Sequence, residues 1–212
     1  ATKDLDIVLV VEALDSAFTE RFWAFVEEGG YEVRERSEGA KVLYRFQKPK
    51  AGDFPAMLEL FSRAREGLKL SEDAHLTPLP IDKAAASLSA ILLDESYYDF
   101  LKSMVREVGG IPVLGEAAII PFKARAWLDL TRQREEGGNV DEKNIRKHRN
   151  DVARLLQLLS QEARYELPSS VADDMRSFVE QATAEADYDP RQFKVNMTRD
   201  DVATRLRAAY QL

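Results

Sequence analysis

The feature that most constrains the fold of this chain is a change in hydrophobic periodicity near Glu116. Before it, short runs rich in Val, Ile and Leu are bounded by Gly, Pro and Asp, which is typical of β-strands. After it, apolar residues recur every three or four positions, which predicts helices at about 117–134, 141–162, 169–186 and 199–211. We therefore expect an α+β protein, with a small mixed sheet and helices in residues 1–115 and a helical bundle in residues 116–212.

Within the first part, the apolar runs and their turn residues predict individual elements. Strands are expected at Leu5–Glu12, Lys41–Gln47 and Ala56–Phe61, and one helix is expected from about Ser16 to Gly29. The turn residues at 49–55 suggest that the second and third strands form a hairpin beside the first.

The rest of the first part is less regular. A short strand is predicted near His75–Leu79, and Ala85–Leu93 is compatible with a helix or a strand. A helix with apolar residues from Tyr97 to Val105 is predicted to end at Gly109-Gly110, followed by an extended piece at Ile111–Leu114.

The composition limits the chemistry available to the chain. There is no cysteine, so disulfides, thiolate metal sites and cysteine nucleophiles are excluded, and two histidines are too few for a histidine-rich zinc site. A bound metal would rest on oxygen ligands, which favour magnesium or manganese. The glycine-rich nucleotide loops, the nucleophile elbow and the helical zinc motif are also absent from the sequence.

Charge and hydropathy limit the partners. The formal net charge of −7 argues against a broad surface for nucleic acid and leaves room for a local basic patch. No apolar run approaches the roughly 20 residues that cross a bilayer, and the first residues resemble a charged strand rather than a signal peptide. We therefore expect a cytoplasmic protein with no membrane partner.

Two aspartates stand at the start of the first predicted strand. Alternate side chains of a strand share a face, so Asp4 and Asp6 lie together, with Cα atoms about 6.6 Å apart. At an effective dielectric constant near 20, two such charges repel by roughly 3 kcal/mol, a cost that a shared divalent cation removes. The alternative is a solvated strand end, where both carboxylates extend into water.

A third carboxylate, Glu59, interrupts an apolar strand between Leu58 and Leu60. A carboxylate there is costly to bury unless it is paired or bound to a metal. Beside the two aspartates it would complete an oxygen site for magnesium, which holds nucleotide phosphates in line with an attacking hydroxyl. The alternative is an outward-facing residue on an exposed sheet.

One lysine occupies an unusual place in the second part. Lys123 lies in the middle of the apolar face of the helix predicted at 117–134. Either its aliphatic stem runs along the core, or its ammonium group points into a cleft that holds phosphates.

The next predicted helix carries the most basic segment of this acidic chain, Lys143–Arg149. Lys147 and Asp151 are spaced as an i, i+4 ion pair, and His148 lies near the edge of the buried stripe. Taken alone, these are typical of a surface ion pair and a partly buried histidine. As a segment, they are suited to attract a nucleotide or an RNA end.

Four segments, taken in order, resemble a known family. They are Thr2–Ile7, Ser87–Leu93 with Tyr97-Tyr98, Pro121–Trp127 and Lys147–Asp151. As a set they resemble bacterial nucleotidyltransferase-like proteins of the abortive-infection toxin group, called AbiEii/AbiGii-like. The resemblance implies a nucleotidyltransferase-like fold and transfer of a nucleotidyl group from a nucleoside triphosphate to an acceptor, which in related toxins is an RNA such as tRNA.

The resemblance also implies roles for individual residues. Asp4 and Asp6 match the family's paired metal-binding acids, and Glu59 matches its third acid, so all three are expected to be catalytic and to hold magnesium or manganese. The positions expected at the substrate are Lys3, Lys123, Lys147 and Asp151. An antitoxin protein is a further implied partner.

One element of the family pattern has no room in the sequence. A Gly-Gly or Gly-Ser pair that cradles the triphosphate is expected upstream of the paired acids, and only three residues precede Asp4. Residues 1–115 are then either an N-terminally truncated nucleotidyltransferase-like part or a part without the cradle. The second possibility favours a non-catalytic binding or regulatory protein that retains the fold. A metal-dependent phosphodiesterase is a third hypothesis.

Overall fold

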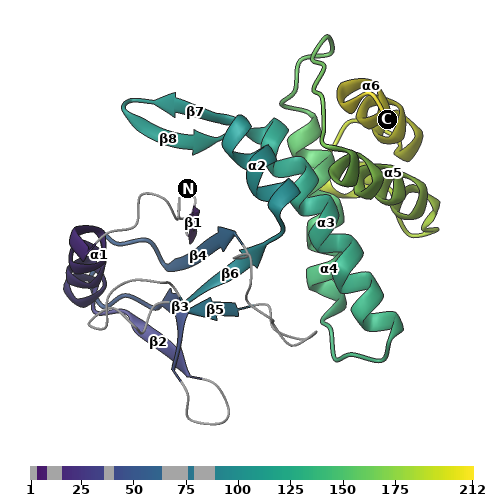
Figure 1. Ribbon diagram of the computed structural model, residues 1–212. Coiled ribbons are helices and arrows are strands. Elements are labelled where there is room, and N and C mark those ends of the chain that lie inside the picture. Colours follow the sequence, from purple (N-terminus) through teal and green to yellow (C-terminus); the bar gives the residue numbers. More distant parts are fainter. Residues whose placement is uncertain (1–3, 9–15, 36–40, 64–75, 79–88) are drawn as a thin grey trace. The chain divides into compact units, whose positions relative to one another are not determined.

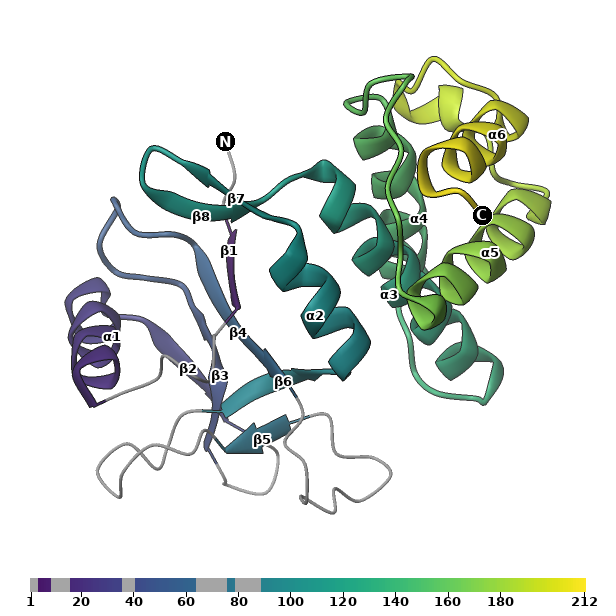
Figure 2. The same ribbon diagram turned by 45° about the horizontal axis from the view of Figure 1, so that its top comes forward.

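The computed structural model describes residues 4–8, 16–35, 41–63, 76–78 and 89–212, and these form an α+β protein (Figures 1 and 2). The chain divides into two compact units, Ala1–Tyr98 and Asp99–Leu212. The first unit is built around a sheet and the second around a group of helices.

The first unit contains six described strands and one complete helix. They are β1 (Asp4–Val8), α1 (Ser16–Gly29), β2 (Glu32–Glu35), β3 (Lys41–Gln47), β4 (Met57–Arg63), β5 (Leu76–Pro78) and β6 (Ser89–Leu93). The sheet has the order β2-β3-β4-β6-β5, and β1 also pairs with β4. β4 pairs antiparallel with β3 and parallel with β1 and β6, so the sheet is mixed, as the sequence predicted.

Helix α1 packs on one face of this sheet (Figure 1). Phe22 and Val26 lie one helical turn apart on α1. Both are buried against strand side chains that point to the same face of the sheet, among them Phe46. The rings of Phe22 and Phe46 meet edge to face, with centroids 5.3 Å apart. The helix ends where Gly30 adopts a positive φ of 60°, a conformation that favours glycine. One face of the sheet is therefore a packed core.

The helix α2 (Glu95–Ser103) crosses the division between the units, and the second unit continues with a hairpin and four more α-helices. These are β7 (Val105–Val108), β8 (Ile111–Leu114), α3 (Glu116–Glu135), α4 (Glu142–Leu156), α5 (Ser169–Ala184), a short 3-10 helix η2 (Pro190–Phe193) and α6 (Arg199–Tyr210). Helices α3 to α6 share one core, which includes Trp127, Leu156, Phe178 and Leu206.

Polar caps and hydrogen bonds fix the ends of these helices. The Asp141 carboxylate accepts a hydrogen bond from the Lys143 amide at the start of α4, and Thr198 and Asp201 form a reciprocal capping box at the start of α6. The buried Tyr210 hydroxyl donates to the Ala117 carbonyl at 2.8 Å and joins α6 to α3. The four helices predicted after Glu116 are thus confirmed, although α4 ends at Leu156 rather than near 162.

The structure corrects the predicted secondary structure at one helix end and completes it at two strands. The helix after Tyr97 ends at Ser103, and the predicted continuation to Gly109 is the strand β7. Strand β2 was not predicted, and the described end of the ambiguous segment 85–93 is the strand β6. The hairpin of β7 and β8 lies in the second compact unit, Asp99–Leu212.

Candidate functional site

Two of the three predicted acids lie side by side on neighbouring strands of the first unit. β1 and β4 run parallel, and Asp6 is in register with Glu59. Residues in register point to the same face of a sheet. Leu58 and Leu60, which alternate with Glu59, have no solvent exposure and pack with α1. Asp6 and Glu59 therefore lie on the face opposite α1.

Two further predicted site residues, Asp4 and Lys3, precede Asp6 in the sequence. Asp4 is in register with Met57, two positions before Glu59. Lys3 lies outside the described residues. The predicted grouping of acids on adjacent strands thus has its backbone basis in the pairing of β1 with β4.

Glu59 has a partner that the sequence analysis did not single out. Arg45 of β3 is in register with Glu59, and both its Nε and one terminal nitrogen contact Oε1 of Glu59. The side chains are 29% exposed for Arg45 and 14% exposed for Glu59. Strand alternation from the buried Phe46 was the signal available, because it assigns Arg45 to the face opposite the core.

This face fits a magnesium or manganese ion by its donor chemistry. Among the described residues, no group of three acidic or imidazole side chains is close enough to form a complete metal cage. Magnesium is usually held by only one or two carboxylates, with water and substrate phosphates completing the octahedron. Asp6 is exposed and in register with Glu59, so the two carboxylates offer oxygen donors to such an ion.

In the second unit, the structure brings Lys123 and Asp151 together. Nζ of Lys123 on α3 lies 3.9 Å from a carboxylate oxygen of Asp151 on α4, and both side chains are partly buried. The same carboxylate group accepts a hydrogen bond from Arg154 at 3.0 Å. Asp151 thus lies between a lysine of α3 and an arginine of its own helix.

His148 lies beside this pair. The pKa of His148 is lowered to about 4, mainly by burial and then by the charge of Lys123, while the charge of Asp151 raises it. Its Nδ1 is buried without a hydrogen-bond partner in the described part of the chain. At neutral pH the imidazole is therefore uncharged, and the positive charge of this cluster comes from its lysines.

The predicted ion pair between Lys147 and Asp151 is not among those found in the described residues, and Asp151 pairs with Lys123 and Arg154 instead. Lys147 is exposed, and its charge lowers the pKa of His148, which places it near the same cluster. Of the predicted substrate-binding residues, the three in the second unit are thus grouped along α3 and α4.

The basic segment Lys143–Arg149 is not one continuous surface patch. Arg149 is buried, with its side chain 4% exposed, and it pairs with Glu185 and with Asp187 at 3.0 Å. Its guanidinium carbon also lies 4.6 Å from the centre of the Tyr188 ring. Arg149 therefore joins α4 to the segment after α5, and the prediction that it helps to attract a nucleotide is not supported by its position.

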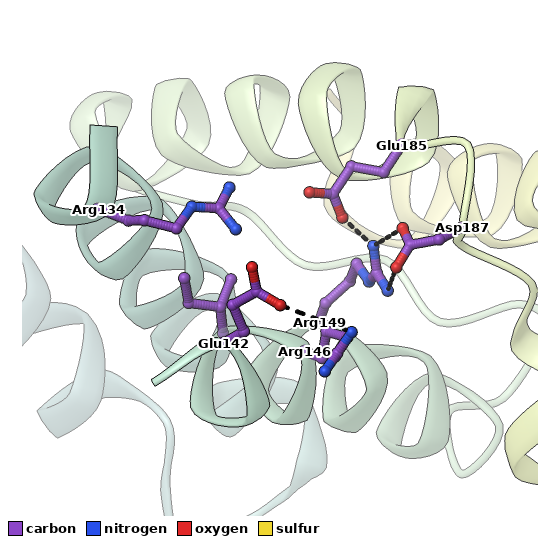
Figure 3. A pocket seen from close by; sticks show the side chains of 7 residues that line it. Arg134, Glu142, Arg146, Arg149, Glu185 and Asp187 are labelled. Carbon is purple, nitrogen blue, oxygen red and sulfur yellow. Dashed lines mark hydrogen bonds and ion pairs between the residues drawn. The ribbon is translucent and has the colours of Figure 1, made fainter. Parts of the chain in front are cut away.

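A pocket of about 180 Å³ opens beside Arg149 (Figure 3). Three arginines and three carboxylates line it: Arg134, Arg146, Arg149, Glu142, Glu185 and Asp187. Because these charges balance, the pocket lacks the positive potential that would concentrate phosphates.

Comparisons with family models, with curated proteins and with solved structures found no match to this chain. No helix in the described residues is long and apolar enough to span a membrane. The function is therefore inferred from the residues and their arrangement.

Proposed function

We propose that this chain is a metal-dependent nucleotidyltransferase of the AbiEii/AbiGii-like kind, with the corresponding fold. It would move a nucleotidyl group from a nucleoside triphosphate to an acceptor such as tRNA. The strongest support is the register of Asp6 with Glu59 on parallel strands, on the sheet face opposite the core. Two carboxylates at this spacing suit a magnesium or manganese ion that also binds phosphate oxygens.

Each group of residues has a separate task in this proposal. Asp6 and Glu59, together with Asp4, would hold the metal, which when bound offsets the charge of the triphosphate and orients the attacking hydroxyl. Lys123 and Lys147 would bind phosphate oxygens as point charges. Lys123 supports this task because its side chain is 29% exposed and its ammonium group lies 3.9 Å from a carboxylate oxygen of Asp151 within the second unit.

The biological role that we infer rests on the resemblance of the sequence. Proteins of this group act as toxins or in defence against phage, so the expected partners are an RNA acceptor and an antitoxin protein. The net charge of −7 agrees with an acceptor bound by a local group of lysines rather than by a broad basic surface.

Replacement of one acid tests the proposal. In the full-length protein, Asp6→Asn removes one metal-binding charge, and we expect transfer of labelled nucleotide to RNA in magnesium to fall at least about 1,000-fold. Asp53→Asn is the matched control, because Asp53 is an exposed turn residue between β3 and β4 where asparagine is equally suited. Transfer by Asp6→Asn at the wild-type rate would exclude this mechanism.

A non-catalytic protein that retains the fold is the second candidate. The ion pair between Arg45 and Glu59 favours it, because Arg45 already supplies a positive charge for that acid. Calorimetry of the full-length protein with magnesium and each nucleoside triphosphate separates the two candidates. Binding of a magnesium nucleotide supports the enzyme, and the absence of binding for all four supports the scaffold.

A further inference from the structure

Three charged residues form a row across neighbouring strands of the first unit. Arg45 of β3 is in register with Glu59 of β4, and Glu59 is in register with Asp6 of β1. Neighbouring strands lie about 4.8 Å apart, so the row places one guanidinium and two carboxylates within about 10 Å. The row lies on the face opposite the core that contains Phe46 and Leu58.

A charged contact joins Arg45 to Glu59. Two nitrogens of Arg45 contact the same oxygen, Oε1 of Glu59. A guanidinium group presents a planar fork that suits two oxygens of a carboxylate or a phosphate. The Arg45 side chain is 29% exposed, so a ligand from solvent can reach it.

A cation that approaches Glu59 meets this guanidinium group. Like charges a few ångströms apart repel, so Arg45 opposes the binding of a divalent cation to Glu59 by repulsion and by occupying Oε1. An anion that binds together with the metal removes this opposition to binding at Glu59. Phosphate oxygens offer Arg45 a new partner of the same geometry, and Glu59 is then released to the metal.

We propose that Arg45 is a positioning residue that competes with the divalent cation for Glu59 and transfers to the triphosphate when both bind, so that metal and triphosphate bind cooperatively. The inference rests on the proposed function, since it takes Glu59 as a metal ligand. It assigns to Arg45 a task that the sequence pattern did not suggest. Coupling of this kind is reciprocal, because each ligand raises the affinity for the other by the same factor.

Substitution of Arg45 tests the coupling by two binding measurements of opposite sign. In Arg45→Gln, we expect Mn²⁺ alone, followed by electron paramagnetic resonance of the free ion, to bind about tenfold more tightly than in wild type. The manganese complex of inorganic triphosphate, measured by calorimetry, should bind about tenfold more weakly. Arg45→Lys keeps the charge and should leave the affinity for Mn²⁺ alone close to that of wild type.

Lys48→Gln is the matched control. Lys48 directly follows β3 and pairs with Glu32 at 2.9 Å, with its side chain 72% exposed. Its substitution removes one positive charge from the same unit without touching Glu59. Both affinities of this variant should remain within about twofold of wild type because exposed charges are screened.

The outcomes separate this inference from the proposed function. If Mn²⁺ binds to neither wild type nor Arg45→Gln, or binds equally to Glu59→Gln and wild type, the metal site itself is excluded. If Glu59→Gln loses Mn²⁺ while Arg45→Gln binds it as wild type does, the metal site remains and the role of Arg45 is wrong. If Arg45→Gln weakens both ligands together, Arg45 has only a structural role.

Discussion

At the scale of single residues, Arg149 shows that a local pattern can reveal burial but not the partners of a buried charge. Arg149 belongs to a basic run, yet its spacing from Ile145 and Val152 puts it on the buried stripe of α4, so its burial was predictable. Its partners, Glu185 and Asp187, are 36 and 38 residues away, and no periodicity links them. Such partners become known only when the fold brings them together.

His148 gives a prediction of pH dependence. Its folded-state pKa is about 4, below the value near 6.5 expected for an unfolded chain, so the unfolded state binds more protons between these values. The stabilisation is therefore complete above about pH 6.5 and is lost as the pH falls toward 4. Because the side chain is only partly buried, we expect a loss of about 1–2 kcal/mol in the free energy of unfolding.

The measurement compares urea unfolding of wild type and His148→Gln from pH 7.5 to 4.5. Glutamine stays neutral, so carboxylate titrations are common to both proteins and the difference isolates His148. The chain has two histidines, and proton NMR of wild type and variant assigns the His148 signal directly. Parallel stability curves, or a measured pKa near 6.5, would contradict the prediction.

At the scale of elements, prediction succeeded where one periodicity dominated. Strands β3 and β4 and helices α3 to α6 follow from alternation or from a 3.6-residue repeat, and the structure confirms them. The helix was predicted to continue past Ser103 because Met104 and Val105 keep the apolar spacing of α2. In the structure α2 ends at Ser103, and strand β7 begins at Val105. Gly109-Gly110 was then taken as a helix stop, whereas it is the turn of the β7–β8 hairpin.

The hairpin turn supplies a prediction for an element. Gly109 and Gly110 have φ angles of 60° and 79°, as a two-residue type I′ turn requires, and an added Cβ at either would meet no atom within 4 Å. Any cost of substitution is thus conformational. For Gly109→Val we expect hairpin opening to become easier by about 1.4 kcal/mol, with amide exchange in β7 and β8 about tenfold faster.

Gly109→Asn is the control for this substitution, because Asn-Gly is favoured in a type I′ turn and should leave amide exchange unchanged. Helix amides of α3 to α6 should exchange equally in all three proteins, since the strands of the hairpin are largely exposed. Equal exchange of the hairpin in both variants would show that the turn does not limit its opening.

At the scale of the whole molecule, long-range pairing decides what the sequence analysis left open. The acids of β1 and β4 were each visible as charges in apolar strands, but their register depends on which strands pair and in which direction. Both hydrophobic cores likewise depend on contacts between residues that are far apart in the sequence. One gathers Phe22, Phe46 and Leu58, and the other gathers residues of four helices separated by as many as 93 positions.

Because each unit has its own core, we expect the two to unfold in separate transitions. The chain has two tryptophans, Trp23 in the first unit and Trp127 in the second, so Trp127→Phe and Trp23→Phe each leave one fluorescent reporter. Leu206→Ala, in the core of the second unit, should cost about 2–5 kcal/mol and lower the urea midpoint reported by Trp127. The midpoint reported by Trp23 should not move.

Leu58→Ala provides the reciprocal measurement, because Leu58 is fully buried in the core of the first unit. It should lower the midpoint reported by Trp23 and leave that of Trp127 unchanged, with each single-tryptophan protein as its own reference. If either substitution moves both midpoints equally, the chain unfolds as one cooperative body. The binding effects of Asp6 and Arg45 substitutions would then have to be separated from the stability of the second unit.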